Sequence, residues 1–295
     1  MLEKSVIQSI LDPILEKLQV EAAMLRLDQI HPIISGNKLF KLKYYLKQAL
    51  ETNMKGIVTF GGAYSNHLVA TAFAAKERGL HAIGYVRGES NDPLTPTLTE
   101  CYAYGMELKF VSRTNFSNLD QDALKKNHPE YSIVPQGGYG IVGAKGASDI
   151  IYNHGVKDFT HIIAACGTGT MGAGIINASE PNQHTILISV LKNNFSIETE
   201  VQRLLTDAGK NRNYQILFQY HMGGYAKKHA EVLKTMNSFF EMQSIPTDFV
   251  YTGKMVHAFY DLASNSFFKP GSKILLIHSG GLQGNRSLSK DELIF

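Results

Sequence analysis

Residues 56–78 read GIVTFGGAYSNHLVATAFAAKER and join a short apolar run to a longer stretch with helical spacing. The apolar run covers residues 57–60, the pair Gly61 and Gly62 follows it, and the helical spacing extends over 68–78. A buried strand, a glycine turn and a helix in this order form a β-α unit. This segment therefore predicts a parallel sheet with helical connections.

The same pattern recurs along the rest of the chain. Further apolar runs of strand length occur at 81–86, 161–166, 185–190, 214–218 and 273–278. Runs without polar alternation suit strands that are buried on both faces, as in parallel sheets covered by helices. We therefore predict an α/β protein.

Length, composition and charge narrow the class of protein further. The chain has 295 residues, of which 44% are hydrophobic and 19% charged, as in an ordinary packed protein of one or two domains. Its 29 Lys and Arg stand against 26 Asp and Glu, and the basic residues are scattered, so we expect no nucleic-acid partner.

The cysteines and the N-terminal segment bear on the location of the protein. Cys101 and Cys166 are too few for a disulfide framework and wrongly spaced for a structural zinc site, so we expect no metal. Residues 1–23 carry charges every few positions, which is unlike a signal peptide, and no apolar run is long enough to span a bilayer. We expect a cytoplasmic protein without membrane contact.

The apolar run at 161–166 ends in a loop of glycine and threonine, Gly167-Thr168-Gly169-Thr170. Glycines allow backbone N–H groups to face an anion, the hydroxyls add donors, and a following helix favours negative charge. The loop lacks the Lys-Ser or Lys-Thr pair of a Walker A motif. It predicts a phosphate site, with a tight turn whose glycines serve packing alone as the alternative.

Lys38 falls in the first turn of a predicted helix that Ser35 or Asn37 can cap. The positive end of a helix dipole is unfavourable for a cation. Such a potential lowers the pKa of a lysine and prepares its amine as a nucleophile. Alternatively, Lys38 is an ordinary solvated lysine like Lys43. This segment alone does not decide between a reactive and a solvated lysine.

Ser65, Asn66 and His67 follow the first predicted strand and offer a hydroxyl, a carboxamide and an imidazole. The segment lacks the glycines of the nucleophile elbow of a serine hydrolase, so we predict no catalytic triad. Ser65 and Asn66 suit helix caps equally well.

Six short motifs stand in one order along the chain. They are Gly36-Asn37-Lys38 with Lys41, Gly61-Gly62-x-x-Ser65-Asn66, Pro135-x-Gly137-Gly138, the loop at 166–170, Tyr251-Thr252-Gly253-Lys254 and His278-Ser279-Gly280-Gly281. Together they resemble the pyridoxal-phosphate enzymes of the 1-aminocyclopropane-1-carboxylate deaminase and D-cysteine desulfhydrase family, over about residues 30–285.

This resemblance implies a two-lobed fold of the tryptophan-synthase-β type (fold type II), each lobe a mostly parallel sheet flanked by helices. It implies a large, discontinuous cofactor-binding domain of residues 1–40 and 138–295 and a small inserted domain of residues 41–137. It also implies a homodimer.

The resemblance assigns roles toward pyridoxal 5'-phosphate as well. Lys38 matches the lysine that holds the cofactor aldehyde covalently, and Asn66 matches the asparagine beside the pyridoxal ring. The matches to the phosphate cradle are Gly167, Thr168, Gly169 and Thr170.

Other matched residues concern the substrate and the type of reaction. Ser65 matches the active-site serine, and Tyr225 and Tyr251 match two tyrosines near the substrate. Cyclopropane deaminases of the family carry glutamate where this chain has Thr252, near the ring nitrogen, and leucine where it has Ser279. A carboxylate keeps that nitrogen protonated and a hydroxyl does not, so Thr252 and Ser279 favour the desulfhydrase-like branch, with Ser279 bonded to the nitrogen. The alternative is a cap or loop hydroxyl without contact to the ring.

We therefore predict a pyridoxal-phosphate-dependent lyase or deaminase of a small amino acid. The expected reaction is β-elimination like that of D-cysteine desulfhydrase, which yields an α-keto acid and ammonia. Two alternatives remain: opening of the cyclopropane amino acid to 2-oxobutanoate and ammonia, and a non-catalytic protein that binds a phosphometabolite.

Overall fold

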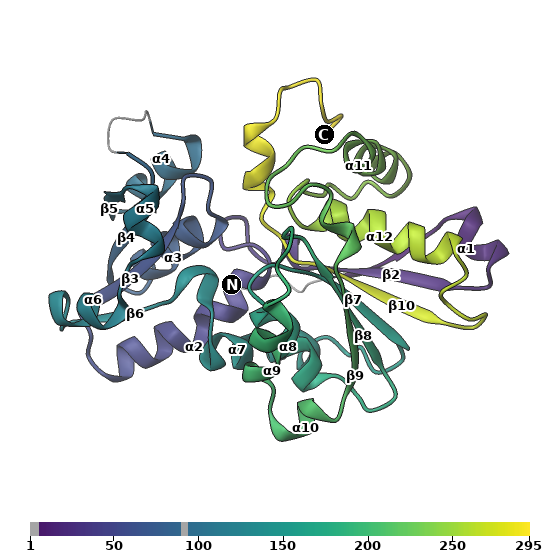
Figure 1. Ribbon diagram of the computed structural model, residues 1–295, viewed down its shortest axis with the longest axis horizontal. Helices are drawn as coiled ribbons and strands as arrows, with labels where there is room; N and C mark the ends of the chain where they lie inside the picture. The colour runs from purple at the N-terminus through teal and green to yellow at the C-terminus, as the bar shows by residue number, and fades with distance from the viewer. Residues whose placement is uncertain (1–5, 90–93) are drawn as a thin grey trace.

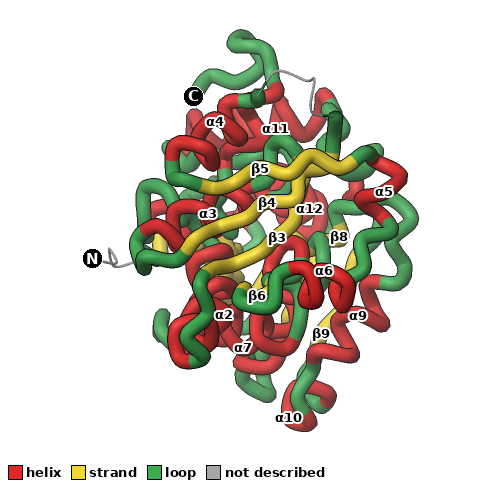
Figure 2. The backbone as a smooth tube through the Cα atoms, turned by 90° about the vertical axis from the view of Figure 1, so that its left-hand side faces the viewer, coloured by secondary structure: helices red, strands yellow, loops and turns green. Residues whose placement is uncertain are grey.

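The computed structural model describes residues 6–89 and 94–295, which form two lobes with one sheet each (Figure 1). The larger sheet has the spatial order β1 (Ile7–Ile10), β2 (Glu21–Arg26), β10 (Lys273–His278), β7 (His161–Cys166), β8 (His184–Ser189) and β9 (Asn213–Leu217). The smaller sheet has the order β5 (Met106–Val111), β4 (His81–Arg87), β3 (Gly56–Gly62) and β6 (Tyr131–Ile133), as Figure 2 shows. Except for the antiparallel pair β1–β2, neighbouring strands are parallel, which confirms the predicted α/β fold.

Helices cover both faces of the larger sheet because its central strands are apolar on both sides. In β7, Ile162 and Ala164 face one core, and Ile163 and Ala165 face the other. The first core is closed by α7 (Ile141–Tyr152), α8 (Thr170–Ala178) and α9 (Ile197–Leu204), with α10 (Asp207–Lys210) beside α8. The second is closed by α1 (Pro13–Lys17), α11 (Ala230–Gln243) and α12 (Thr252–Ser264).

The smaller sheet is covered in the same way. One face packs against α2 (Asn37–Glu51), α3 (Asn66–Lys76) and α4 (Pro96–Ala103). The other face packs against α5 (Arg113–Ser117) and α6 (Gln121–Asn127). The connections between these elements contain short 3-10 turns: η1 (Leu27–Gln29), η2 (Gln136–Gly138), η3 (Gln219–His221) and η4 (Leu282–Ser287).

Helix α2 belongs to both lobes. Phe40 packs in the core of the larger lobe, whereas Leu42 and Leu46 pack in that of the smaller lobe. The apolar spacing of this helix therefore serves two cores, and the boundaries 41 and 137 of the inserted domain stay a prediction. Among the described residues, no helix combines the length and the apolar character that crossing a bilayer requires.

Candidate active site

A cavity of about 620 Å³ opens where β3, β7 and β10 end at their carboxyl sides, the place where open parallel sheets bind ligands. The sequence-predicted site residues that line it are Lys38, Ser65, Asn66, Gly167, Thr168, Gly169, Tyr225, Tyr251 and Ser279. Thr170 and Thr252 do not line the cavity, since both are fully buried.

The turn that presents Lys38 is held by backbone contacts. Helix α2 follows Gly36, and no side chain caps it, so the predicted cap by Ser35 or Asn37 was wrong. Instead the Ser35 hydroxyl accepts a hydrogen bond from the Gly281 N–H at 3.1 Å, and the Asn37 N–H donates to the Ser279 carbonyl at 2.9 Å. These bonds fix the start of α2 against the end of β10.

The Lys38 amine lies in the cavity, and its Nζ donates to Asn37 Oδ1 at 2.9 Å. Burial lowers the pKa of Lys38 to about 8, and the negative charge of Asp248 opposes this shift. An appreciable fraction of the amine is therefore neutral near physiological pH, as a nucleophile requires. Burial, and not the helix dipole on which the sequence argument relied, is the main cause.

Lys41 is a second lysine in the cavity. It belongs to the first of the six motifs, but the sequence alone assigned it no role. It lies three residues after Lys38 on the same helix face and is 3% exposed. Burial, and after it the charge of Lys38, hold the pKa of Lys41 well below its usual value. An anion close to this buried amine would stabilise its charged form. The spacing of three residues was the signal available in the sequence.

The sequence left open whether Ser65 and Asn66 cap a helix or belong to the site, and the structure places both at the start of α3 and in the lining of the cavity. Ser65 caps α3, because its hydroxyl accepts from the Leu68 N–H at 3.3 Å, and it also lines the cavity. Asn66 donates from Nδ2 to the Gly281 carbonyl at 2.9 Å, while its buried Oδ1 has no partner among the described residues. Asn66 therefore retains an acceptor for a ligand.

His67 lies behind these two residues, and its hydrogen bonds define its tautomer. The Thr59 hydroxyl donates its one proton to the Val134 carbonyl at 2.8 Å, so His67 Nε2 must donate to Thr59 Oγ1 at 2.7 Å. Burial and the two cavity lysines hold the pKa of His67 well below its usual value. The imidazole is therefore neutral, and its Nδ1 is a buried acceptor without a described partner.

The glycine and threonine loop leads into α8 with its N–H groups available. Gly169, in the left-handed region at φ 82°, precedes the helix, and no side chain caps it. The first N–H groups of a helix have no intrahelical acceptor, so this end attracts an anion. The hydroxyls of Thr168 and Thr170 lie 3.3 Å apart. A Cβ on Gly167 would lie 3.2 Å from Tyr251 Cε1, so this tyrosine packs directly on the loop.

Tyr225 and Tyr251 form one wall of the cavity. Their rings meet edge to face, with centroids 6.2 Å apart. Burial raises the pKa of both phenols above the ordinary value, so both hydroxyls are protonated at neutral pH. The pair therefore offers hydrogen-bond donors to a ligand.

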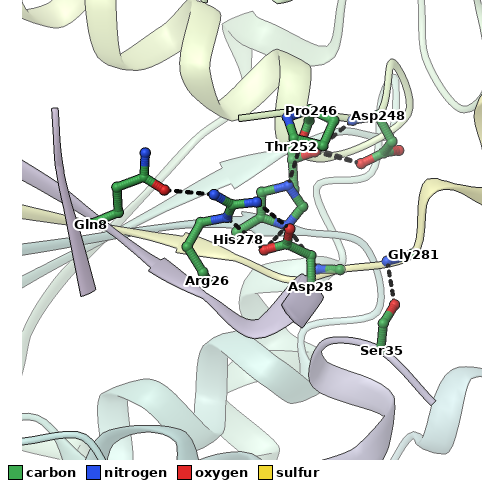
Figure 3. A network of polar contacts seen from close by, with 10 residues as sticks. Gln8, Arg26, Asp28, Ser35, Pro246, Asp248, Thr252, His278 and Gly281 are labelled. Carbon is green, nitrogen blue, oxygen red and sulfur yellow. Dashed lines mark hydrogen bonds and ion pairs between the residues drawn. The ribbon is translucent and has the colours of Figure 1, made fainter. Parts of the chain in front are cut away.

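Contrary to the expectation for Thr252, this residue does not line the cavity, and its hydroxyl is bonded to Asp248 (Figure 3). Thr252 Oγ1 donates to Asp248 Oδ1 at 2.7 Å and accepts from the Asp248 N–H at 2.8 Å. Asp248 also accepts from the N–H groups of Val250, Tyr251 and Thr252, each at 2.9 Å, and thereby closes the start of α12. Asp248 lines the cavity in its place, and burial raises the pKa of this carboxyl.

Ser279 lines the cavity and directly follows His278, which belongs to a buried polar network. Figure 3 shows this network. His278 Nε2 donates to the Pro246 carbonyl at 2.7 Å, and its Nδ1 accepts from the Gly280 N–H at 3.2 Å. Asp28 lies 3.4 Å from that Nδ1 and forms two hydrogen bonds with Arg26, at 2.9 and 2.7 Å. The network fixes the backbone on both sides of Ser279.

Lys254 does not line the cavity. Its fully buried ammonium donates to the carbonyls of Val190, His221 and Gly224 at 3.3, 2.8 and 2.6 Å. Burial lowers its pKa to about 8. Lys254 thus anchors the loop that carries Tyr225.

The sequence and the fold are similar to known proteins along nearly their whole length. The family described as "Pyridoxal-phosphate dependent enzyme" matches residues 11–280. A relative from Pyrococcus furiosus, named putative 1-aminocyclopropane-1-carboxylate deaminase, is 30% identical over an aligned length of 271 residues, and the match covers 85% of this chain and 82% of the relative. A mitochondrial protein of Arabidopsis thaliana, named bifunctional D-cysteine desulfhydrase/1-aminocyclopropane-1-carboxylate deaminase, is 26% identical over 85% of this chain and 70% of its own.

A solved structure described as an ACC deaminase homologue superimposes with a TM-score of 0.80 at 25% identity. It covers 96% of this chain and 91% of its own. The likeness extends over both lobes and therefore includes the cavity between them.

Proposed function

The chain belongs to the family of pyridoxal-phosphate-dependent enzymes, and from this premise we propose that it catalyses β-elimination on a small amino acid of the D-cysteine type. In this reaction the amino acid and one water yield an α-keto acid, ammonia and the leaving group, which is hydrogen sulfide for cysteine. Relatives named deaminase and desulfhydrase support an enzyme of this family over the non-catalytic alternative.

The residues present fit the cofactor. The loop from Gly167 to Gly169 and the uncapped start of α8 suit its phosphate. A bound phosphate would also favour the charged form of the buried Lys41, whose pKa is low without an anion. Lys38, with its lowered pKa, suits the covalent bond to the aldehyde. The buried Asn66 Oδ1, which has no described partner, suits the ring hydroxyl.

When bound, the pyridoxal ring withdraws electrons from the α-carbon of the substrate. Lys38 is the group proposed to hold the α-proton once the substrate has displaced it, because its pKa of about 8 lies close to physiological pH. Ser65 and the first turn of α3 are proposed to bind the substrate carboxylate. Tyr225 and Tyr251 are proposed to orient the leaving group with their protonated hydroxyls.

One observation carries the choice of reaction: Ser279 faces the cavity from a fixed backbone, whereas Thr252 is bonded to Asp248. Asp248 itself already accepts four hydrogen bonds and therefore has little remaining capacity to bind a ring nitrogen. We assign the ring nitrogen to the Ser279 hydroxyl. A neutral partner leaves that nitrogen unprotonated, which suits elimination.

Opening of the cyclopropane amino acid is the second candidate. The names of the Pyrococcus furiosus and Arabidopsis thaliana relatives favour it. This substrate has no α-proton, so it requires a nucleophile or a differently placed acid, for which Ser65 and Tyr251 are the available side chains.

The first experiment locates the cofactor. Borohydride reduction of the coloured holoenzyme followed by peptide mapping should place the label on Lys38, and the Lys41→Ala variant should keep that label. Label on Lys41 would refute the assignment of the lysine. A colourless protein that does not bind the cofactor would refute the proposed function.

The second experiment identifies the reaction. D-cysteine, L-cysteine, β-chloro-D-alanine, D-serine and the cyclopropane amino acid are compared for release of keto acid. We expect release from D-cysteine and β-chloro-D-alanine. Release from the cyclopropane compound alone would establish the second candidate instead.

Two further expectations stay predictions. We propose a homodimer, which sedimentation of the holoenzyme would test, and a cytoplasmic location, which cell fractionation would test.

A further inference from the structure

Two arginines of the smaller lobe, Arg87 and Arg113, line the cavity, and the reaction proposed above does not use them. Arg87 is the last residue of β4 and Arg113 the first residue of α5, just after β5. The two strands pair with Arg87 opposite Val111, so both arginines lie at the same edge of the smaller sheet. Figure 2 shows β4 and β5 side by side, with α5 at the end of β5.

Both guanidinium groups are exposed, and neither forms an ion pair or hydrogen bond with the parts of the chain that the structure describes, 6–89 and 94–295. Four of the other five arginines do have such partners, whereas the Nε of Arg212 is buried without one among the described residues. Arg26 binds Asp28, Arg78 binds the Ala74 carbonyl, Arg203 binds Glu200 and Arg286 binds Glu100. Arg113 also stands at the start of a helix, where a cation lowers helix stability.

Basic side chains outnumber carboxylates among the described residues that line the cavity. Among the described lining residues, Lys38, Lys41, Arg87 and Arg113 are basic, and Asp248 is the one carboxylate. The cofactor would engage Lys38 through its aldehyde and Lys41 through its phosphate. The start of α3 at Ser65 suits the α-carboxylate of the substrate, which leaves both arginines for another group.

Arg87 is close to the loop that would hold the substrate. It pairs with Gly62 of β3, three residues before Ser65, and its Nη2 lies 4.0 Å from the position of a Cβ on Gly62. The Arg87 guanidinium therefore lies beside the loop that leads to Ser65, where the substrate carboxylate is proposed to bind, and Arg113 lines the same cavity. Arginine is the residue that best matches carboxylates, sulfonates and phosphates through paired hydrogen bonds.

We propose that Arg87 and Arg113 bind an anionic group on the substrate side chain, and that the enzyme prefers β-substituted alanines with a charged sulfonate or phosphate leaving group over neutral ones. This inference rests on the proposed function for its reaction, but the binding of the anion is independent of turnover. The two arginines are specificity determinants of the cavity.

The binding test uses the holoenzyme and inert probes. Succinate and 3-sulfopropionate, which carry two anionic groups, are compared with butyrate, which carries one, by isothermal titration. The dianions should bind at least about tenfold more tightly than butyrate, and Arg87→Gln and Arg113→Gln should each abolish most of that difference. Arg78 lies just beyond the far end of α3, so Arg78→Gln is the matched control and should retain that difference.

The kinetic test separates the side-chain role from other roles. Both enantiomers of cysteate and O-phosphoserine are compared with D-cysteine and β-chloro-D-alanine. In Arg87→Gln and Arg113→Gln, KM for the charged substrates should rise at least about tenfold and KM for the neutral ones less than about threefold, with partial recovery in Arg87→Lys. Preference between cysteate and O-phosphoserine distinguishes a sulfonate from a phosphate.

Several results would overturn the inference. Equal effects on charged and neutral substrates would show that the arginines bind the α-carboxylate, and no effect on either would show that they do not bind substrate. A wild-type enzyme that handles D-cysteine but binds the dianions no better than butyrate would refute the inference alone. A holoenzyme that releases no keto acid from any amino acid would refute the proposed function, while the titration would still decide on the arginines.

Discussion

Asn66 and Gly281 join the two lobes at the cavity, because the side-chain amide of Asn66 donates to the Gly281 carbonyl at 2.9 Å. Asn66 begins α3 in the smaller lobe, and Gly281 follows β10 in the larger lobe. The other end of the same carboxamide, Oδ1, is buried without a described partner. One side chain thus connects the lobes and still offers an acceptor to a ligand.

Substitution of Asn66 should affect both properties. Asn66→Ala should lower the free energy of unfolding of the cofactor-free protein by about 1–2 kcal/mol through the lost hydrogen bond. It should also weaken cofactor binding about tenfold, which titration of the visible absorbance measures. Asn66→Asp retains an acceptor oxygen and should bind the cofactor better than Asn66→Ala. Equal cofactor affinity in the wild type and both variants would contradict the role of Oδ1.

Gly36 should tolerate no side chain. Its φ is 69°, and a Cβ there would lie 1.7 Å from the Ser279 carbonyl oxygen. Gly36→Ala should therefore lower the free energy of unfolding by more than about 4 kcal/mol or prevent folding. Gly155→Ala is the matched control, since Gly155 also has a positive φ of 60° but open space around it. It should cost only about 1 kcal/mol. Similar costs in urea unfolding would disprove the importance of this close approach.

The pKa of Lys38 predicts how stability changes with pH in the cofactor-free protein. Its folded value of about 8 lies below the ordinary 10.5, so between these values the unfolded chain binds more protons than the native state. Stability should therefore rise with pH from about 8 upward, at up to about 1.4 kcal/mol per pH unit from this one group. Lys38→Met should remove that increment from urea midpoints measured at pH 7.5–9.5. Lys47→Met removes an exposed lysine of the same helix and is the control; an unchanged slope in Lys38→Met would contradict the prediction.

Removal of one partner of the buried Asp28 and Arg26 pair should strongly destabilise the larger lobe. Burial acts to raise the pKa of Asp28, but the hydrogen bonds and positive charge of Arg26 hold it below its usual value of 3.8. Asp28→Asn leaves the Arg26 charge buried without a counterion and should cost about 3 kcal/mol at pH 7. The double variant Arg26→Met, Asp28→Leu should recover part of that loss.

The sign of the pH dependence follows from the lowered pKa of Asp28. The contribution is complete above pH 3.8 and is lost as pH falls through the folded value. The difference in urea midpoint between wild type and Asp28→Asn should therefore shrink on acidification below about pH 4. A difference that stays constant from pH 7 to pH 3 would show that the pair is not the source.

Thr252 and Ser279 should respond differently to loss of their hydroxyls. Thr252→Val removes a donor from Asp248 and should lower the free energy of unfolding by about 1–2 kcal/mol, without a change in the cofactor spectrum. Ser279→Ala should shift the visible absorbance of the holoenzyme and leave the stability of the cofactor-free protein nearly unchanged. If Thr252→Val instead shifted the visible absorbance and Ser279→Ala did not, Thr252 and not Ser279 would be the partner of the ring nitrogen.

The sequence predicted the fold where strands are buried on both faces and helices follow them. Runs such as 161–166 and 273–278 are uninterrupted by charge, and the structure has β7 and β10 with those bounds. It missed β1, β2, β5 and β6. In the edge strand β5, Glu107 and Lys109 interrupt the apolar pattern. Strand β2 is buried in both cores, but its apolar run of residues 22–25 is short and flanked by the charged Glu21 and Arg26.

The site was predictable in its loops but not in the direction of its side chains. Glycine-rich segments after parallel strands meet at one edge, so their order along the chain was informative. Whether Thr252 or Asp248 faces the cavity depends on the turn that starts α12, which residue spacing does not determine. Arg87 and Arg113 became visible as a pair only through the register of β4 with β5.

The close backbone approach of Gly36 and Gly280 has a mechanical consequence. Their Cα atoms leave no room for a Cβ on either residue, and Lys38 lies two residues after Gly36. The contact clamps the start of α2 to the segment that follows β10, and the bond from the Asn37 N–H to the Ser279 carbonyl reinforces it. We therefore expect the backbone at Lys38 and at Ser279 to keep one spacing, whichever small ligand the cavity holds.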